Sequence, residues 1–227
     1  MSTIDIVVLH MAIQKTNARG EDTRKRLLDA ATRLFSDRGF EGVTTREIAA
    51  DANTTLPSIP HHFGSKEGLY QAVIASIAEE IAKHLSPASA VALTVLGRKN
   101  ASRKDKIDAL ENLVITNAGA LLQSRSEWAQ LMVREQLRPT APLSPLNELL
   151  ERDVLDPLIR LIASLTHTPS EGTEAKLRAM ALLGRVVIFR VAKTSLLRIM
   201  GWQELTPARI RVILESFRAE IRSLFVG

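Results

Sequence analysis

Residues 44–70, TTREIAADANTTLPSIPHHFGSKEGLY, contain two short helical patterns joined by a tight turn. Thr44 and Glu47 have the spacing of a capping box, in which a hydroxyl and a carboxylate each bind an otherwise unpaired backbone NH at a helix start. Apolar side chains then recur at helical spacing, and residues 53–55 supply turn and capping chemistry before a second short helix that reaches His62. This spacing predicts a helix-turn-helix, a motif whose second helix enters the major groove of DNA.

The segments on both sides of the motif support this interpretation. An amphipathic helix is predicted over Asp22–Arg38, and Ser65 is expected to cap a long helix that runs to about Leu85. With the R-G-F turn at 38–40 and the HHFGSKEGLY ending, residues 23–75 resemble the amino-terminal domain of TetR-family transcriptional regulators. The resemblance implies a DNA operator and a small-molecule effector. A short recognition helix reads few base pairs, so we also expect a homodimer on a palindromic operator.

The resemblance assigns DNA contacts residue by residue. Arg46 matches the family arginine that reaches a base edge, and a phosphate clamp is its alternative role. One histidine of the motif is expected to donate to a phosphate while the other packs beside Phe63, and Lys66 should help to hold a phosphate at a helix start. The expected DNA contacts are Thr45, Arg46, Thr55, Leu56, Pro57, Ser58, His61, His62 and Lys66.

Pro60 departs from the family pattern, which usually places an aromatic residue there. Proline cannot donate a backbone hydrogen bond or propagate a regular helix, so we expect a short or 3₁₀-like recognition element with weakened or altered DNA affinity. A degenerate module that has lost its DNA reader therefore stays open as an alternative. A further alternative is an activator, or a protein controlled by a protein partner.

Helical periodicity continues through the rest of the chain, and strand signals are nearly absent, which predicts an all-α fold. We expect a flexible arm at 1–20, the helix-turn-helix domain at 21–67, and an effector-binding and dimerisation domain at 68–227. Pro87 is expected to end or kink the long helix, and Pro157 to interrupt a later one.

The last two long helices are predicted over Thr173–Met200 and from Thr206-Pro207 to about Phe225. The segments VREQLRPT, AMALLGRVVIFRVAKTSLLRIMGW and LTPARIRVILESF resemble the ligand-sensing domain of the CecR (CerR-like) branch of the TetR family. These two helices are the candidates for a four-helix dimer interface, and packing inside the monomer core is the alternative. The dimer candidates are Leu177, Val187, Ile188, Val191, Leu196, Ile210, Ile213, Leu214, Phe217 and Ile221.

The resemblance also implies a small-molecule pocket among the middle helices. Apolar and hydrogen-bonding side chains suit its lining, and an arginine suits an anionic ligand, although ordinary core packing is the competing explanation for each residue. The candidates are Trp128, Met132, Gln136, Arg185, Phe189 and Arg190.

The composition limits the other classes of function. No apolar run approaches the ~20 residues that span a bilayer, so we expect no membrane segment. The chain has no cysteine, which agrees with a reducing cytoplasm. It has no glycine-rich phosphate loop, no H-E-x-x-H and no G-x-S-x-G, which disfavours an enzyme, and we expect no cofactor and no metal. The net charge of +5 is no evidence for DNA binding, because residues 1–70 hold nine basic and nine acidic residues.

Overall fold

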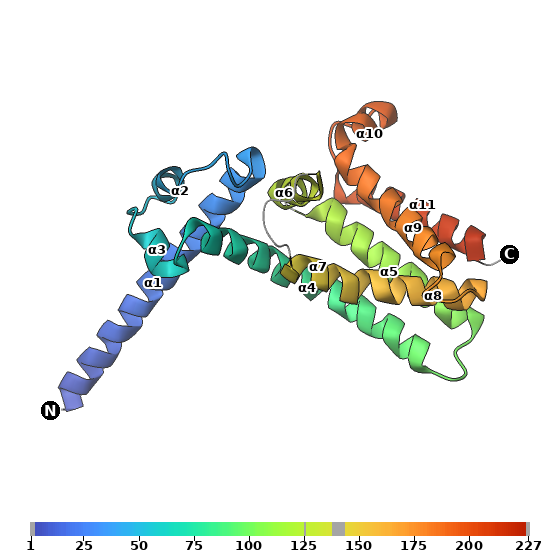
Figure 1. Cartoon of the computed structure of the whole chain (residues 1–227), viewed down its shortest axis with the longest axis horizontal. Coiled ribbons are helices and arrows are strands. Elements are labelled where there is room, and N and C mark those ends of the chain that lie inside the picture. Colours follow the sequence, from blue (N-terminus) through green and yellow to red (C-terminus); the bar gives the residue numbers. More distant parts are fainter. Residues whose placement is uncertain (1–2, 125, 138–143, 226–227) are drawn as a thin grey trace. The chain divides into compact units, whose positions relative to one another are not determined.

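The computed structural model describes residues 3–124, 126–137 and 144–225, with side chains from residue 19 onward except those of residues 126, 132, 135–137, 144 and 145. All regular structure in these residues is helical (Figure 1), which confirms the all-α prediction. The elements are α1 (Thr3–Arg38), α2 (Thr45–Asp51), α3 (Ser58–Phe63), α4 (Lys66–Gly97), α5 (Arg103–Gln123), α6 (Ser126–Leu137), α7 (Ser144–Leu150), a π-helical turn (Glu151–Leu155), α8 (Asp156–Thr166), α9 (Thr173–Val191), α10 (Lys193–Met200) and α11 (Pro207–Phe225).

The chain divides into two compact units. The N-terminal unit comprises Met1–Ser76 with Gln130–Pro142, and the C-terminal unit comprises Ile77–Ala129 with Leu143–Gly227. Helices α4 and α6 therefore each contribute residues to both units.

The core of the N-terminal unit is built on one face of α1. Leu27, Ala31 and Phe35 recur along this face and are fully buried. Phe35 packs against Tyr70 of α4 with ring centroids 5.0 Å apart. The unit buries further apolar side chains from α2, α3 and α4, namely Ile48, Ala49, Ile59, Leu69 and Val73. Burial of this stripe holds the two short helices of the motif, which are too short to be stable alone.

Two helix bounds in this region differ from expectation. Helix α1 begins at Thr3, ahead of the predicted start at Asp22, because residues 3–19 contain no proline and Gly20 alone costs a helix only about 1 kcal/mol. Helix α4 continues through Pro87, so the proline does not end the helix. Its neighbours Ala88 and Ala92 are buried, and this packing offsets the roughly 3 kcal/mol that an internal proline costs.

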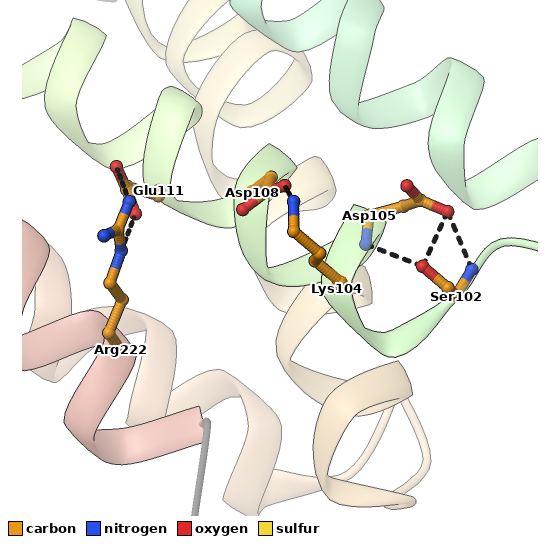
Figure 2. Close-up of polar contacts among 6 residues, drawn as sticks. All are labelled: Ser102, Lys104, Asp105, Asp108, Glu111 and Arg222. Atoms are coloured by element: carbon orange, nitrogen blue, oxygen red, sulfur yellow. Dashed lines mark hydrogen bonds and ion pairs between the residues drawn. The ribbon is translucent and has the colours of Figure 1, made fainter.

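The core of the C-terminal unit lies among α5, α8, α9 and α11 (Figure 1). Leu110 of α5, Leu161 of α8 and Ile221 of α11 are at most 1% exposed. Polar contacts fix the start of α5 (Figure 2): Ser102 and Asp105 form a capping box, with the Asp105 amide donating to the Ser102 Oγ over 3.1 Å. The same figure shows the carboxylate of Glu111 on α5 bound by Arg222 of α11 at 2.8 Å.

The second half of this unit contains two breaks that differ from the predicted ones. The interruption expected at Pro157 takes the form of a π-helical turn just before it, and the chain stays helical through Pro157, the second residue of α8. The predicted helix over Thr173–Met200 is divided at Ala192 into α9 and α10. Among the described residues, none of the helices has the length and apolarity to cross a bilayer.

Candidate DNA-binding site

The start of α2 is fixed by the predicted capping box. The Thr44 hydroxyl accepts from the Glu47 amide at 3.3 Å, and the Glu47 carboxylate accepts from the Thr44 amide at 2.8 Å. Arg38, the last residue of α1, adds an ion pair to the other carboxylate oxygen at 2.7 Å. The Thr44 hydroxyl first, and then Arg38, lower the pKa of Glu47 from 4.5 to about 2. The carboxylate thus joins α1 to the helix that carries Arg46.

Replacing Glu47 with Gln should make stability less dependent on pH in acid. A carboxyl whose folded pKa is depressed stabilises the fold above its unfolded pKa, and that contribution is lost as the pH falls through the folded value. For Glu47 the window runs from pH 4.5 down to about 2. Urea unfolding followed by circular dichroism should show the wild type losing stability more steeply across this window than E47Q.

The control for this prediction is Glu204→Gln, which removes an exposed carboxylate for which the described residues show no ion pair. That variant should follow the wild-type slope. Parallel slopes for wild type and E47Q would contradict the role given to the capping box.

The turn between α2 and α3 is held by an arginine of α1. Arg26 Nη1 donates to the backbone carbonyls of Ala52 and Asn53 at 3.1 and 3.0 Å. Asn53 has φ +50°, a left-handed conformation that asparagine tolerates better than most residues. Arg26 therefore stabilises the turn of the motif.

The leading edge of α3 is exposed, as the assignment of DNA contacts requires. Thr55, Leu56 and Pro57 are exposed and Ser58 is half-buried, with its hydroxyl 3.1 Å from the Thr55 hydroxyl. Backbone bonds from Ser58 to Thr55 and from Ile59 to Leu56 span three residues and make a 3₁₀-like entry.

The body of the recognition helix is short, as expected, but α-helical. The Gly64 amide donates to the Pro60 carbonyl four residues back, over 3.0 Å. Pro60 itself is exposed and lies near the helix start, where its missing NH disturbs few bonds. The expectation of a 3₁₀-like element therefore holds only for the entry turn.

The histidines and Lys66 occupy positions that differ in part from expectation. His61 is exposed and His62 half-buried, and their rings lie 4.9 Å apart at a steep angle. His62 also lies beside Phe63, at 6.2 Å between ring centroids. The Lys66 ammonium stands 4.3 Å from the centroid of the Phe40 ring, so it has a cation–π partner in the absence of DNA. Among the described residues no cluster of His, Asp and Glu has metal-site geometry.

Arg46 differs from three arginines of α1. Arg26, Arg33 and Arg38 all have partners on α2 or in the turn that follows it. Arg46 is exposed in the first turn of α2, and the described residues give it no hydrogen bond or ion pair. Thr45 beside it is half-buried. The first turn of α2 and the leading edge of α3 therefore present one unpaired guanidinium together with hydroxyl and apolar groups.

Five of the six candidate effector residues are either partly buried, paired with another residue, or outside the described side chains. Phe189 packs edge-on against Phe217 at 5.1 Å, and Trp128 is half-buried. Arg185 is paired with Glu220, which removes it as a ready anion partner. The side chains of Met132 and Gln136 lie outside the described part of the structure.

Arg190 is the most confined of these candidates. Its Nη2 donates to the backbone carbonyl of Ser124 at 3.1 Å, and burial lowers the pKa of its guanidinium although the charge of Glu127 opposes the shift. A partly desolvated cation of this kind favours an anionic neighbour.

The dimer candidates on α11 are not exposed on the monomer surface, contrary to the prediction. Ile210, Ile213, Phe217 and Ile221 are at most 6% exposed and belong to the monomer core, and Leu214 packs against that core. They fill the space between α11 and α5. These side chains are therefore not available for an interface on the monomer surface. They pack inside the monomer core, which is the alternative stated for the last two helices.

The candidates on α9 are exposed instead. Leu177 is 64% exposed, Ile188 53% and Val191 52%. Other exposed residues of α9 extend them into an apolar stripe, hereafter the α9 stripe, which comprises Leu177, Met180, Ala181, Gly184, Val187, Ile188 and Val191. Sequence reasoning missed its continuity, although the alternating steps of four and three residues from 177 to 191 are the signal of a helix-pairing seam.

Comparisons with known proteins match both parts of the chain. Residues 27–73 match the family described as "Bacterial regulatory proteins, tetR family". Residues 107–225, which are 119 of the 227, match the family described as "HTH-type transcriptional dual regulator CecR, C-terminal domain". The HTH-type transcriptional dual regulator CecR of Shigella flexneri is 28% identical over 214 residues, which are 92% of this chain and 94% of that protein. The HTH-type transcriptional repressor AcnR of Corynebacterium glutamicum is 27% identical over 143 residues, 62% of this chain and 63% of that protein.

Solved structures share the fold over most of their length. A crystal structure of AibR in complex with isovaleryl coenzyme A and operator DNA matches with a TM-score of 0.59 and 20% identity, covering 89% of this chain and 98% of that one. A TetR-like transcriptional regulator from Rhodococcus sp. RHA1 matches with a TM-score of 0.56 and 25% identity, covering 89% and 95%.

Proposed function

The chain belongs to the TetR family of bacterial regulatory proteins and carries a C-terminal domain of the CecR type, and from this we propose that it is a ligand-responsive repressor. The family consists of DNA-binding transcriptional regulators, so the chain is a regulator and not an enzyme. In the proposed mechanism a homodimer binds a palindromic operator in the cytoplasm, and a small molecule releases it.

The observation that carries the DNA-binding part is the unpaired Arg46 beside the exposed edge of α3. A guanidinium binds guanine O6 and N7 with two parallel hydrogen bonds, which distinguishes G from other bases in the major groove. Leu56, 44% exposed, offers apolar contact to a thymine methyl. Lys66 and the exposed His61 are proposed donors to phosphate oxygens.

The dimer is supported by the α9 stripe. Two half-sites lie one duplex turn apart, about 34–36 Å, so two copies of the motif must be held at a fixed spacing. The stripe is an apolar surface on one helix, and polar surface is otherwise the rule on an unpartnered helix face. A second copy of the same helix matches it by symmetry, because a twofold interface joins identical patches.

The effector part rests on Arg190, whose guanidinium is partly buried and donates to the Ser124 carbonyl. A partly desolvated cation of this kind suits a small anionic molecule. Binding of such a molecule is proposed to change the spacing of the two DNA-reading helices, with a coupling of about 1–3 kcal/mol between the sites. The long helix α4, which begins in one unit and ends in the other, is the first candidate for transmitting the change.

The sign of regulation has two candidates. AcnR is named a repressor, whereas CecR, which matches over nearly the whole chain, is named a dual regulator. An activator at some operators is therefore the second proposal. The two are separated by transcription in vitro from a template that carries the selected operator, with and without the protein.

The experiment that tests the function is selection from a random duplex pool with the purified full-length protein, followed by fluorescence anisotropy at about 150 mM salt, where nonspecific attraction to phosphates is weakened. We expect a palindrome to be enriched. A folded protein that enriches no sequence would overturn the proposal and would favour the degenerate module.

Replacing Pro60 with Tyr tests that alternative directly. Pro60 is exposed on α3, and its ring offers no hydrogen-bond donor to a phosphate. If the proline has disabled the reader, P60Y should bind DNA roughly tenfold more tightly, the gain of about one charge-assisted hydrogen bond. We expect a smaller change, below about threefold, because the Gly64 amide already closes a regular turn on the Pro60 carbonyl.

The control for this experiment is Pro169→Tyr, which changes an exposed proline outside the motif and should leave DNA affinity unchanged. A tenfold gain in P60Y alone would show that the natural chain has a weakened DNA reader.

A further inference from the structure

Arg134 of α6 holds the last turn of α1 within the N-terminal unit. Its Nη2 donates a 2.6 Å hydrogen bond to the backbone carbonyl of Asp37, and the last carbonyls of a helix have no partner inside it. A cation is favoured there because the carbonyl end of a helix carries partial negative charge. Arg134 also lies over Gly39, which ends α1 with φ +76°. A Cβ at residue 39 would stand 2.9 Å from Arg134 Nη1, so glycine at this position leaves room for the Arg134 side chain.

The same turn of α1 is in contact with the base-reading end of α2. Arg38 follows Asp37 in the chain and pairs with Glu47 at 2.7 Å. Glu47 closes the capping box with Thr44, and Arg46 lies in this first turn of α2. Direct contacts therefore lead from Arg134 to the backbone that carries Arg46, all within one compact unit.

Helix α6 also belongs to the other unit at its start. Residues up to Ala129 group with the C-terminal unit, and residues from Gln130 group with the N-terminal unit. The first turn contains Trp128 and Glu127, and the charge of Glu127 acts on Arg190. Because α6 is one unbroken helix, a shift of its first turn displaces Arg134 as well.

We propose that Arg134 is a positioning residue through which α6 controls the DNA-binding surface. With Arg134 on the Asp37 carbonyl, the last turn of α1 is ordered and the start of α2 is held. Withdrawal of α6 frees that carbonyl and loosens the ion pair and the capping box beyond it. The step in which an effector moves α6 rests on the proposed function, whereas the step from Arg134 to α1 rests on the observed hydrogen bond to Asp37. This route differs from transmission through α4, because it changes how well the backbone is ordered inside the N-terminal unit.

Hydrogen exchange on the full-length protein tests the local step without DNA or effector. In Arg134→Ala we expect the amides of Gly39 and Glu47 to exchange at least fivefold faster than in wild type, because both lie on the route. The internal control is the Gly68 amide, which the Ser65 hydroxyl caps at 3.0 Å in the same unit but off the route, and which should not change. Equal acceleration at all three amides, or none, would overturn the proposal.

Two further variants separate positioning from a general loss of folding. Arg134→Lys keeps a cation and a donor and should recover part of the protection at Glu47. Arg160→Ala removes an exposed arginine paired with Asp156 on α8 and should leave all three amides unchanged. If R134K exchanges as fast as R134A while both retain the helical circular dichroism of the wild type, the donor at this position does not act as proposed.

A double-mutant cycle on the selected operator tests the step to DNA. Arg134→Ala and Arg38→Ala should each weaken binding about fivefold, and the double variant should bind at least threefold more tightly than the product of the two effects predicts. The control cycle combines Arg134→Ala with Arg33→Ala, whose ion pair with Asp51 joins α1 to the other end of α2, and this cycle should be additive. Additivity in both cycles would overturn the route. If no operator is enriched, the repressor proposal fails and the exchange experiment alone decides the role of Arg134.

Discussion

Replacing Ile188 with Glu is expected to convert the protein from a dimer into a monomer that no longer retains the selected operator. Ile188 is 53% exposed in the C-terminal half of the α9 stripe, which the proposed twofold interface buries against the same stripe of a second copy. Burial of an unpaired carboxylate costs about 3–5 kcal/mol, so the dimer dissociation constant should rise at least roughly 100-fold. The measurement is sedimentation equilibrium over a range of protein concentrations.

Loss of the dimer should also reduce DNA affinity without any change in the DNA-contacting residues. Two linked heads bind adjacent half-sites with an advantage of about 10²–10⁴ over one head, and a monomer loses that advantage. The affinity of I188E for the full palindrome, measured by fluorescence anisotropy, should therefore fall to the affinity for a single half-site. The half-site itself should bind I188E and wild type equally.

The matched control for I188E is Val212→Glu. Val212 lies on α11, outside the α9 stripe, and at 57% exposed it is as accessible as Ile188. V212E adds the same charge and should remain a dimer. A dimeric I188E, or a monomeric V212E, would place the interface elsewhere on the C-terminal unit.

The helix-turn-helix could be predicted from the sequence because its signals are local. Thr44 and Glu47 are three residues apart, and the structure forms the capping box that this spacing predicts. Ser102 and Asp105 have the same spacing, and they form a capping box at the start of α5. In both cases the side chain and the backbone group that it satisfies lie within one helical turn, so no knowledge of the tertiary structure is needed.

The burial of each face of the C-terminal helices could not be predicted in the same way. Both α9 and α11 carry apolar side chains at helical spacing, and periodicity alone does not distinguish a core face from an interface face. The structure buries Ile213 and Phe217 of α11 against α5, while Ile188 of α9 stays exposed. Pro87 shows the same limit, because buried neighbours on α4 outweigh a strong local signal for a helix end.

Hydrogen bonds between residues far apart in the chain could not be predicted from the sequence. Arg134 and Asp37 are 97 residues apart, and neither has a pattern that identifies the other. The turn clamp by Arg26 has the same character, with its acceptors 26 and 27 residues away. The sequence shows several arginines between residues 21 and 67, but only the structure separates Arg26, Arg33 and Arg38, which hold the fold, from Arg46, to which the described residues give no hydrogen bond or ion pair.

Replacing Arg46 with Ala is expected to remove sequence-selective DNA binding while leaving the fold intact. Its guanidinium has no hydrogen bond or ion pair among the described residues, so its loss breaks no such contact in that part of the chain. One bidentate contact to guanine contributes about 1–3 kcal/mol of discrimination, and the proposed dimer makes it twice. Two such contacts sum to about 2–6 kcal/mol, so affinity for the selected palindrome should fall by roughly 30-fold to roughly 20,000-fold. The urea midpoint should change little, since substitutions of exposed residues usually alter stability by less than about 0.5 kcal/mol.

The alternative role of Arg46, a phosphate clamp, predicts a different pattern of loss. A lost phosphate contact weakens binding about equally to all sequences and lowers the slope of log affinity against log salt by about one per contact. A lost base contact abolishes the preference for guanine at one position of each half-site and leaves the salt slope nearly unchanged. Anisotropy with R46A on the palindrome and on duplexes with that guanine replaced distinguishes the two. Arg33→Ala is the control, because Arg33 is similarly exposed in the same unit but is committed to Asp51 at 2.7 Å, so its loss should leave the base preference unaltered. Retention of the guanine preference in R46A would move the base contact to the leading edge of α3, where Thr55 and Ser58 carry the remaining hydroxyl donors.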